Sequence, residues 1–473
     1  MSILLISFLI IVIIAALSHK RTDTTDPYDA SFMNETEIAS RFNKGFCING
    51  RRSLTIEDSI KHLLITGGTG AYKTSGILIP SILKMAGHVS FVINDPSGEL
   101  LELTSGPLQK KGTKVKVLNY NAPSEGFNPL ARVNLDSLSS IKKISKLIIT
   151  TALGSGGRDP FWNASAENLC SLCIQAVLEL MPKEYHTLSN VYFLASIIGA
   201  EPERADRFFI KGSTSLLMEY KAVIAYPQNT ILSIIATLRT ALSIFGTDNN
   251  VSLVTSHDTI DFEEFRYSKV ALFINNSVTT MKYHAVTTSL FLDQFFEHIM
   301  SSRPDPKKIY PTFICIDEAS SLVFNNLQIT ISNIRKHYAG ILQAYQSVSQ
   351  LIDLYTSPVA RAIIENSFTR IYMAGQPLNV ALELEALIGK TEYVDERNNR
   401  HIGPLLPANK IHELSDSLIF CGNHRAIKTP ITPFFKRGNL RRLTQLPPYQ
   451  PINKIPFKKP PLFPFDLNEK SYA

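Results

Sequence analysis

The chain has 473 residues, of which 44% are hydrophobic and 19% are charged, and its formal net charge is +7. This composition excludes an intrinsically disordered chain, and the length predicts two or three domains. The modest positive charge permits a polyanionic partner but does not require one.

The first eighteen residues, MSILLISFLIIVIIAALS, contain no charged side chain. Their number is near the lower limit of about 17 residues for a helix that spans a bilayer. His19, Lys20 and Arg21 follow the apolar run, whereas a cleaved signal peptide carries its basic residues before it. The order predicts an uncleaved, single-pass transmembrane anchor at residues 1–18, with the bulk of the chain cytoplasmic. The alternative is an apolar terminal helix that docks on the folded core.

Residues 19–55 are polar and irregular, which predicts a tether. Beyond them, short apolar runs rich in β-branched and aromatic residues are bounded by turn formers. This pattern predicts an α/β domain whose buried sheet is mainly parallel. The predicted strands are residues 62–66, 89–94, 114–120, 269–275, 312–317, 340–345, 370–375 and 417–422.

Residues 137–245 have helical spacing of their apolar residues and little strand signal. They predict an all-alpha domain inserted into the α/β domain, whose two parts are residues 56–136 and 246–440. The tail, residues 441–473, carries seven prolines between positions 446 and 465. Because proline does not continue a helix or a sheet, we expect this tail to be extended.

The stretch LLITGGTGAYKTSG, residues 63–76, reads as a strand that runs into a phosphate-binding loop. Gly67 and the pair Lys73-Thr74 have the spacing of the G-x-x-x-x-G-K-[ST] pattern, but Tyr72 replaces the second glycine. In such a loop the lysine contacts the β- and γ-phosphates, and the threonine hydroxyl binds Mg²⁺. The alternative is an ordinary glycine-rich turn. The predicted nucleotide-binding residues are Gly67, Gly68, Thr69, Gly70, Ala71, Tyr72, Lys73, Thr74 and Ser75.

A second motif, PTFICIDEAS, is an apolar strand that ends in Asp317 and Glu318. We expect Asp317 to hold Mg²⁺ together with Thr74, and Glu318 to polarise the attacking water. Taken alone, the two acids are more simply explained as a cap of the next helix. Ligands of open α/β sheets, however, bind beyond the carboxyl ends of the strands, where both motifs would lie. The two motifs together therefore predict one site for ATP and Mg²⁺.

Two more residues belong to the predicted catalytic set, which comprises Glu318, Lys73, Gln346 and Arg335. Gln346 ends the strand GILQAY and is expected to sense the γ-phosphate, although a polar strand end is the simpler alternative. Arg335 precedes the same strand and is a candidate arginine finger for a neighbouring subunit. An ordinary surface arginine is the alternative there.

Several stretches, in this order, make the chain similar to the type IV secretion coupling proteins of the TraG/TraD-like family. The similarity covers about residues 60 to 430, which makes it more specific than any single motif. The stretches are IPSILKMAGHVSFVINDPSGELLELTSG, KVKVLNYNAPSEGFNPLARV, DPFWNASAENLC, FICIDEASSL, GILQAYQSVSQL and IIENSFTRIYMAGQ.

The resemblance implies a RecA-like P-loop NTPase domain with an inserted all-alpha domain, a homo-hexameric ring and an anchor in the bacterial inner membrane. It also implies a motor ATPase that delivers relaxase-bound single-stranded DNA, protein effectors or both to a type IV secretion channel. The alternative function is a non-hydrolysing recruitment platform for secretion substrates, with a degenerate phosphate loop. A cytosolic nucleic-acid helicase is a third possibility, which the apolar N-terminus disfavours.

The chain departs from the family pattern at three places. Tyr72 stands where the phosphate loop usually has glycine. The family's D-P-K-G-E stretch is Asp95-Pro96-Ser97-Gly98-Glu99 here, without the lysine. Members of the family commonly have two membrane helices, and the sequence predicts one.

Overall fold

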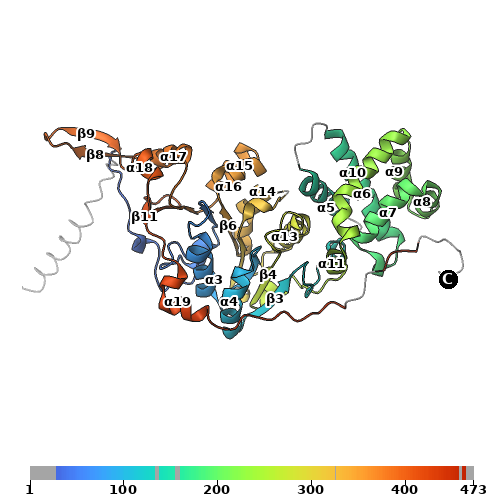
Figure 1. The fold of residues 1–473 in the computed structure, drawn as a ribbon, viewed down its shortest axis with the longest axis horizontal. Coiled ribbons are helices and arrows are strands. Elements are labelled where there is room, and N and C mark those ends of the chain that lie inside the picture. Colours follow the sequence, from blue (N-terminus) through green and yellow to red (C-terminus); the bar gives the residue numbers. More distant parts are fainter. Residues whose placement is uncertain (1–27, 134–137, 155–159, 325, 457–460, 465–473) are drawn as a thin grey trace, which may run out of the picture.

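The computed structural model describes residues 28–133, 138–154, 160–324, 326–456 and 461–464. The predicted anchor, residues 1–18, lies outside these ranges. Figure 1 shows a central sheet with helices on both faces, a hairpin at one end of the molecule and a group of helices at the other.

The central sheet has nine strands among the described residues, in the order β11-β10-β7-β1-β6-β5-β2-β4-β3. The seven strands from β7 to β3 in this order are parallel, whereas β10 and β11 run antiparallel at one edge. All eight predicted strands are present. The strands are β1 (Leu63–Thr66), β2 (Ser90–Asn94), β3 (Lys114–Leu118), β4 (Val270–Ile274), β5 (Thr312–Ile316), β6 (Ala339–Tyr345), β7 (Thr369–Tyr372), β10 (Ser417–Cys421) and β11 (Ile427–Thr429).

Both faces of the sheet are buried, which explains why the central strands are almost continuously apolar. Alternate residues of a strand point to opposite faces, so Leu63 and Ile65 belong to one core cluster and Leu64 belongs to another. Helices α3, α4 and α19 contribute to the first cluster, and α13, α14 and α16 to the second. The flanking helices are α2 (Ile56–Ser59), α3 (Ile79–Met85), α4 (Glu99–Lys110), α12 (Glu264–Tyr267), α13 (Ala285–Met300), α14 (Leu327–Asn333), α15 (Val348–Leu354), α16 (Ser357–Glu365), α17 (Leu378–Ile388), α18 (Ala408–His412) and α19 (Gly438–Leu443).

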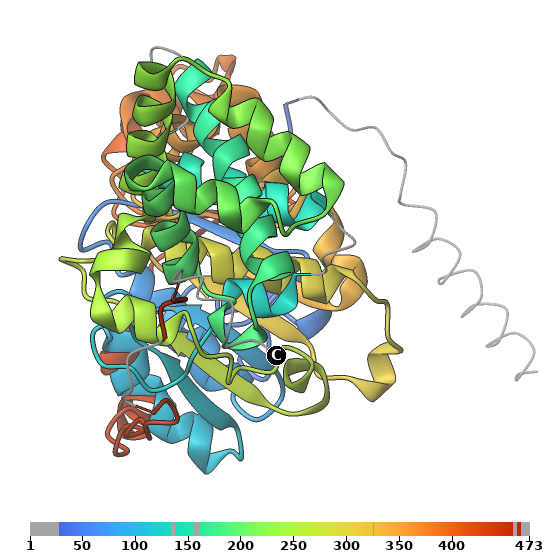
Figure 2. The same ribbon diagram turned by 90° about the vertical axis from the view of Figure 1, so that its right-hand side faces the viewer.

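Between β3 and β4 the described chain forms helices and no strand, and we call this part the helical segment. It extends to Val254, beyond the predicted boundary at residue 245. Figure 2 views the molecule from this side and shows the helical segment in front of the sheet. Its helices are α5 (Leu138–Leu153), α6 (Pro160–Leu180), α7 (Leu188–Ala200), α8 (Pro202–Phe209), α9 (Thr214–Ile224), α10 (Gln228–Thr247) and α11 (Asn249–Val254).

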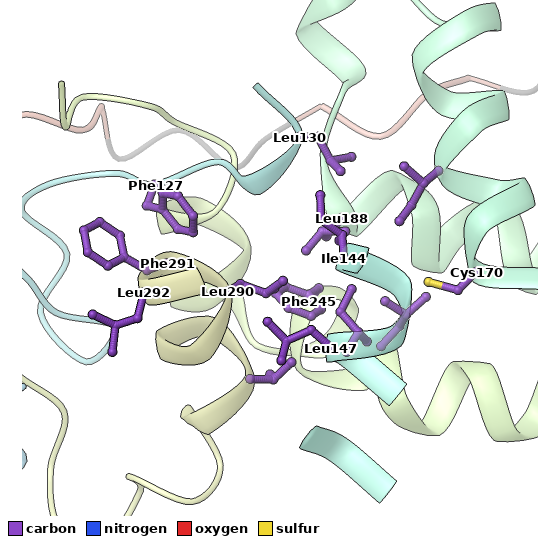
Figure 3. Packing of buried hydrophobic residues seen from close by; sticks show 14 of the residues in the cluster. Phe127, Leu130, Ile144, Leu147, Cys170, Leu188, Phe245, Leu290, Phe291 and Leu292 are labelled. Carbon is purple, nitrogen blue, oxygen red and sulfur yellow. The ribbon is translucent and has the colours of Figure 1, made fainter. Parts of the chain in front are cut away.

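A continuous apolar cluster joins the helical segment to the sheet through α13 (Figure 3). On the side of the sheet, the Phe127 and Phe291 rings meet edge to face with their centroids 5.0 Å apart. Leu290 of α13 and Phe245 of α10 continue the cluster into the helical segment. Because this cluster contains residues of both parts, the described residues of the helical segment and of the α/β part share one core.

Among the described residues, α10 is the one helix long and apolar enough to cross a membrane. It packs against α6 and α7 inside the helical segment. Core helices of folded domains pass the same test of length and composition, so this finding is weak evidence for a membrane span.

Two regions differ from what the sequence suggests. Phe46, Ile48 and Leu54, in the stretch assigned to the tether, are fully buried against the sheet. A two-stranded hairpin, β8 (Lys390–Val394) and β9 (Arg400–Pro404), was not predicted. Residues near the described N-terminal end pair with this hairpin, where Asp29 forms a bridge with Thr391.

Candidate nucleotide site

Residues 67–75, the predicted phosphate loop, follow β1 at the carboxyl edge of the parallel sheet, and we keep the name phosphate loop for them. Tyr72 ends the loop in a left-handed backbone conformation, with φ 65° and ψ 27°. Glycine adopts such angles without steric cost, which explains why glycine is usual at this position. The tyrosine therefore preserves the backbone path of the loop, and its half-exposed ring packs edge to face against Phe435, with centroids 6.2 Å apart.

Lys73 opens the π-helical stretch Lys73–Leu78 that leads into α3. Its ammonium donates hydrogen bonds to the carbonyl oxygens of Gly67 (2.6 Å) and Gly68 (3.1 Å), so it lies over the loop. Burial lowers the pKa of Lys73 from its usual value, and the carboxylates of Glu318 and Asp317 oppose this shift. A partly buried ammonium held over a glycine-rich loop is positioned to receive a phosphate group.

Asp317 lies at the carboxyl end of β5 and accepts a hydrogen bond from the Thr74 hydroxyl, with Oγ1 and Oδ2 3.0 Å apart. The amide of Asn94, at the end of β2, donates to the backbone oxygen of Asp317 (3.0 Å) and fixes the end of the strand. Burial raises the pKa of Asp317 to about 6; the Thr74 hydrogen bond opposes this shift, and the carboxylates of Glu318 and Asp95 add to it.

These residues fit a magnesium ion. The Thr74 hydroxyl and the Asp317 carboxylate are hard oxygen donors of the kind that Mg²⁺ prefers. Burial is the main cause of the raised pKa of Asp317, and the carboxylates of Glu318 and Asp95 add to it; a bound divalent cation would stabilise the charged form of Asp317 against both effects.

Glu318 follows directly, also in a left-handed conformation with φ 55°. Such backbone strain in a non-glycine residue persists only where the surrounding structure enforces it, and it occurs preferentially at functional sites. The Gln346 amide at the end of β6 donates to Glu318 Oε2 over 3.2 Å. The structure therefore brings together Lys73, Thr74, Asp317, Glu318 and Gln346, which come from three strand ends.

A cavity of about 280 Å³ lies over the loop. Its lining residues include Glu99, which is not among the site residues predicted from the sequence. Asp95 positions this part of the chain, since its carboxylate accepts from the backbone N–H of Leu101 (2.7 Å) in the first turn of α4. In place of the family's lysine, the Ser97 hydroxyl donates to Asp95 Oδ1 (3.3 Å). The sequence does contain a feature that points to Glu99: the stretch D-P-S-G-E, which Glu99 ends, directly follows a predicted strand of the same sheet. The cavity is lined by Thr69, Gly70, Ala71, Tyr72, Lys73, Thr74, Ser75, Glu99 and Glu318.

Arg335 is not part of this group. It lies in a 3-10 turn, Ile334–His337, that precedes β6, whereas Gln346 follows the same strand. Because β6 is parallel to β1, Arg335 lies at the amino edge of the sheet, near His62 and opposite the phosphate loop. Its side chain is exposed, so it is accessible to another molecule but not to the site of its own chain.

Comparison with known proteins gives consistent matches. The family profile described as "Type IV secretory system Conjugative DNA transfer" matches residues 14–409. The "Probable conjugal transfer protein TraG" of Sinorhizobium fredii is 25% identical over 305 residues, which cover 62% of this chain and 47% of that protein. The "Type IV secretion system-coupling protein VirD4" of Bartonella quintana is 21% identical over 350 residues, which cover 70% and 53%. The chain thus spans about half the length of these relatives.

Among solved structures, the plasmid coupling protein TrwB in complex with ADP and Mg²⁺ has a TM-score of 0.67 with this chain. The two are 18% identical, and the match covers 86% of this chain and 91% of the TrwB chain. This likeness shows that the two chains have the same α/β fold. Since the family profile covers most of the sequence, the chain belongs to the type IV secretory system conjugative DNA transfer family, the coupling proteins.

Proposed function

We propose that the chain is an ATP-hydrolysing motor subunit with a RecA-like P-loop domain. The observation that carries this proposal is the hydrogen bond between Thr74 and Asp317, because it joins two motifs that lie far apart in the sequence. A plain glycine turn and a simple helix cap, the alternatives for each motif alone, give no reason for the two to meet. The TrwB complex with ADP and Mg²⁺ supports ATP and Mg²⁺ as the ligands of this fold.

Nucleotide binding uses the loop and the lysine. Backbone N–H groups of residues 67–75 and the amino end of the following helix stabilise phosphate oxygens. The Lys73 ammonium exchanges the carbonyl oxygens of Gly67 and Gly68 for the β- and γ-phosphates. The nucleoside extends into a neighbouring hollow of about 470 Å³, which the loop shares with Gly375 and Ile431.

Hydrolysis uses the acidic turn. Thr74 and Asp317 hold Mg²⁺, which neutralises phosphate charge when it is bound. Glu318 accepts a hydrogen bond from the attacking water and polarises it. Gln346 donates to the Glu318 carboxylate, so it orients that carboxylate and couples its position to the γ-phosphate.

The proposal extends to the assembly. Residues 1–18 anchor the chain in the bacterial inner membrane, the bulk of it is cytoplasmic, and six copies form a ring. Each ring passes relaxase-bound single-stranded DNA, protein effectors or both to the type IV secretion channel. The inserted all-alpha domain, residues 137–245, faces the substrate. Family membership supports these statements, and contact with a nucleic-acid backbone predicts strong dependence of DNA binding on salt.

Two substitutions separate binding from hydrolysis. Lys73→Ala is expected to weaken binding of Mg·ATP and to lower turnover at least about 10²-fold, because it removes the phosphate-binding charge. Glu318→Gln is expected to retain nucleotide binding but to lower turnover by about 10² to 10⁴-fold, because it removes the general base. Nucleotide affinity and phosphate release, measured with and without single-stranded DNA, check both expectations.

Lys110→Ala and Glu102→Gln, on exposed positions of α4, are the matched controls and should leave both quantities unchanged. A wild-type chain that binds Mg·ATP without hydrolysing it in any assembly state would favour the recruitment platform instead. Wild-type turnover in the Lys73→Ala variant would contradict the whole site.

A further inference from the structure

The C-terminal tail lies along the outside of the α/β part, and its last described residues, 461–464, lie against the helical segment (Figure 1). It begins on α4, where the Tyr449 backbone N–H donates to the Ser105 hydroxyl (2.9 Å). The Pro447 carbonyl oxygen lies so close to Gly106 that a Cβ on that glycine would be 2.2 Å away. Since α4 begins with Glu99 at the phosphate-loop cavity, the tail starts on an element of the candidate nucleotide site.

Farther along, Lys454 fixes the tail beside the point where the helical segment joins the sheet. Its ammonium pairs with Glu125 Oε1 over 2.6 Å, and its backbone N–H donates to the Ser124 carbonyl (2.9 Å). The Glu125 carboxylate is almost completely buried, and its other oxygen accepts from the Thr259 hydroxyl. A buried carboxylate needs such partners, so this contact with the tail is specific and not incidental.

The last described part of the tail is held by one side-chain amide, that of Asn190 in the first turn of α7. Asn190 Oδ1 accepts from the Phe463 backbone N–H (2.9 Å), and Asn190 Nδ2 donates to the Pro461 carbonyl (3.2 Å). Asn190 is fully buried, and its Nδ2 also donates to the Tyr185 carbonyl and the Thr187 hydroxyl, both 3.0 Å away. The amide is therefore fixed in place and presents one donor and one acceptor to an extended backbone.

Of the four described side chains of residues 461–464, that of Phe463 is buried and the other three are exposed. Phe463 is 6% exposed, and its ring meets Tyr185 edge to face at 5.2 Å and Phe208 at 5.9 Å between centroids. Leu462 is 47% exposed. Of the three residues 461–463, the third, Phe463, places an aromatic side chain in the pocket, and the second, Leu462, does not enter it. The first, Pro461, favours an extended backbone.

Without the tail, Asn190 Oδ1 would lose the backbone donor that it has here, and the Phe463 pocket would be open. The Asn190 amide, fixed by its bonds to Tyr185 and Thr187, would then present a donor and an acceptor beside an apolar recess between Tyr185 and Phe208, which suits an extended peptide with an aromatic side chain. We propose that α7, α8 and the turn before α7 form a binding site for an extended Pro–X–Phe peptide, which the chain's own residues 461–463 occupy in cis. The site takes the same motif from another polypeptide when the tail is released. While it is filled, the tail links α4 to the helical segment.

The test uses the full chain with Phe463→Ala, which empties the pocket, and a fluorescent peptide with the sequence of residues 459–466, KPPLFPFD. The peptide is expected to bind this variant at least about 10-fold more tightly than the wild-type chain, whose own tail fills the site. A peptide in which alanine replaces the phenylalanine of position 463 should lose at least about 10-fold in affinity. A peptide with alanine at position 462 should bind equally well, because Leu462 faces solvent.

Asn190→Asp, combined with Phe463→Ala, retains a side-chain oxygen but removes the donor to the Pro461 carbonyl, and should reduce peptide affinity by about 10-fold. Circular dichroism and Mg·ATP binding verify that each variant is folded. Equal peptide affinity for the wild-type and Phe463→Ala chains, or no binding to a folded Phe463→Ala chain, overturns the proposal. If Phe463→Ala does not fold, Phe463→Val, whose smaller side chain fills only part of the space of the ring, takes its place under the same criteria. These outcomes do not depend on hydrolysis, so failure here leaves the proposed motor function untouched.

Discussion

At the carboxyl edge of the sheet, the polar side chains of the candidate site bond to one another, as Thr74 does to Asp317. At the amino edge, His62 is bonded to the backbone through both ring nitrogens: Nε2 lies 2.8 Å from the Ile331 carbonyl oxygen, and Nδ1 accepts from the Ile341 N–H (3.1 Å). These partners assign the proton to Nε2. One edge thus holds groups suited to a ligand, and the other holds groups that are satisfied by the fold itself.

The difference indicates where substitutions should act. Changes at the carboxyl edge should affect turnover more than folding, and changes at the amino edge should affect folding more than turnover. Arg335 is an exception to this expectation: it lies at the amino edge, but its side chain is exposed, so its replacement should not affect folding. If it acts on catalysis, it acts on a neighbouring copy.

The largest effect is expected for Arg335→Ala. As an arginine finger, it would stabilise the transition-state charge of the neighbour, and its loss should lower turnover by about 10³-fold or more. Nucleotide affinity of the isolated chain and its thermal unfolding should not change, because Arg335 is remote from its own site. Turnover measured as a function of protein concentration, with the oligomer monitored by light scattering, checks this expectation.

Lys336→Ala is the matched control, since Lys336 is the next residue, is also exposed, and bonds within its own turn to Asn333 Oδ1 (3.2 Å). It should leave turnover intact. If Arg335→Ala and Lys336→Ala behave alike, Arg335 is an ordinary surface residue and the finger lies elsewhere.

The next effect concerns stability and pH. Burial lowers the pKa of His62 from 6.5 to about 4; the bond to the Ile331 carbonyl opposes the shift, and the charge of Arg335 adds to it. Below pH 6.5 the unfolded chain takes up a proton that the folded chain excludes until about pH 4, so stability falls as the pH is lowered through this window. This shift in the pKa of His62 corresponds to a loss of about 3 kcal/mol at most in the free energy of unfolding.

His62→Asn removes this titration, and asparagine tolerates the left-handed backbone that His62 adopts, with φ 75°. The variant should be less stable at pH 7, because hydrogen bonds are lost, but its free energy of unfolding should depend less on pH between 6.5 and 4. Urea unfolding at several pH values measures this slope. His424→Ala, at an exposed position after β10, is the control that should retain the wild-type slope. An unchanged slope in His62→Asn would show that His62 is not the titrating group.

The sequence predicts the central strands well because each is an apolar run that the fold buries on both faces. It fails for the β8–β9 hairpin, where Tyr393 and Ile402 are largely exposed and no buried face produces a pattern. Burial of Phe46 and Leu54 was missed for the opposite reason: isolated apolar residues in a polar stretch give no periodicity, and only the completed sheet supplies their partners.

For the site, the rule that ligands bind at the carboxyl ends of strands is enough to predict that the loop with Thr74 and the strand end with Asp317 lie together. It does not predict the contact between Gln346 and Glu318, which depends on the ends of two neighbouring strands, β6 and β5, and on the left-handed turn at Glu318. The place of Glu99 in the cavity could not be predicted, because it depends on how the Asp95 carboxylate accepts from the first turn of α4.

The smallest effect tests the phosphate loop itself. Tyr72 and Gly70 both have left-handed backbone angles, with φ 65° and 80°, but only one of them is a glycine. Tyr72→Gly should be more stable than Tyr72→Ala by about 1 kcal/mol, because both lose the ring and only alanine retains the strained backbone.

Gly70→Ala makes the opposite change, from glycine to alanine at a left-handed position. A Cβ on residue 70 would meet no atom within 4 Å, so the substitution changes stability through the backbone conformation alone. It should destabilise the chain by about 1 kcal/mol. Thermal unfolding measures all three variants, and ATP turnover should persist in Tyr72→Gly. If Tyr72→Gly is no more stable than Tyr72→Ala, the loop does not hold residue 72 in a left-handed conformation, and the reason given for glycine at this position fails. If Tyr72→Gly is stable but inactive, the aromatic ring takes part in the reaction and is more than a tolerated replacement for glycine.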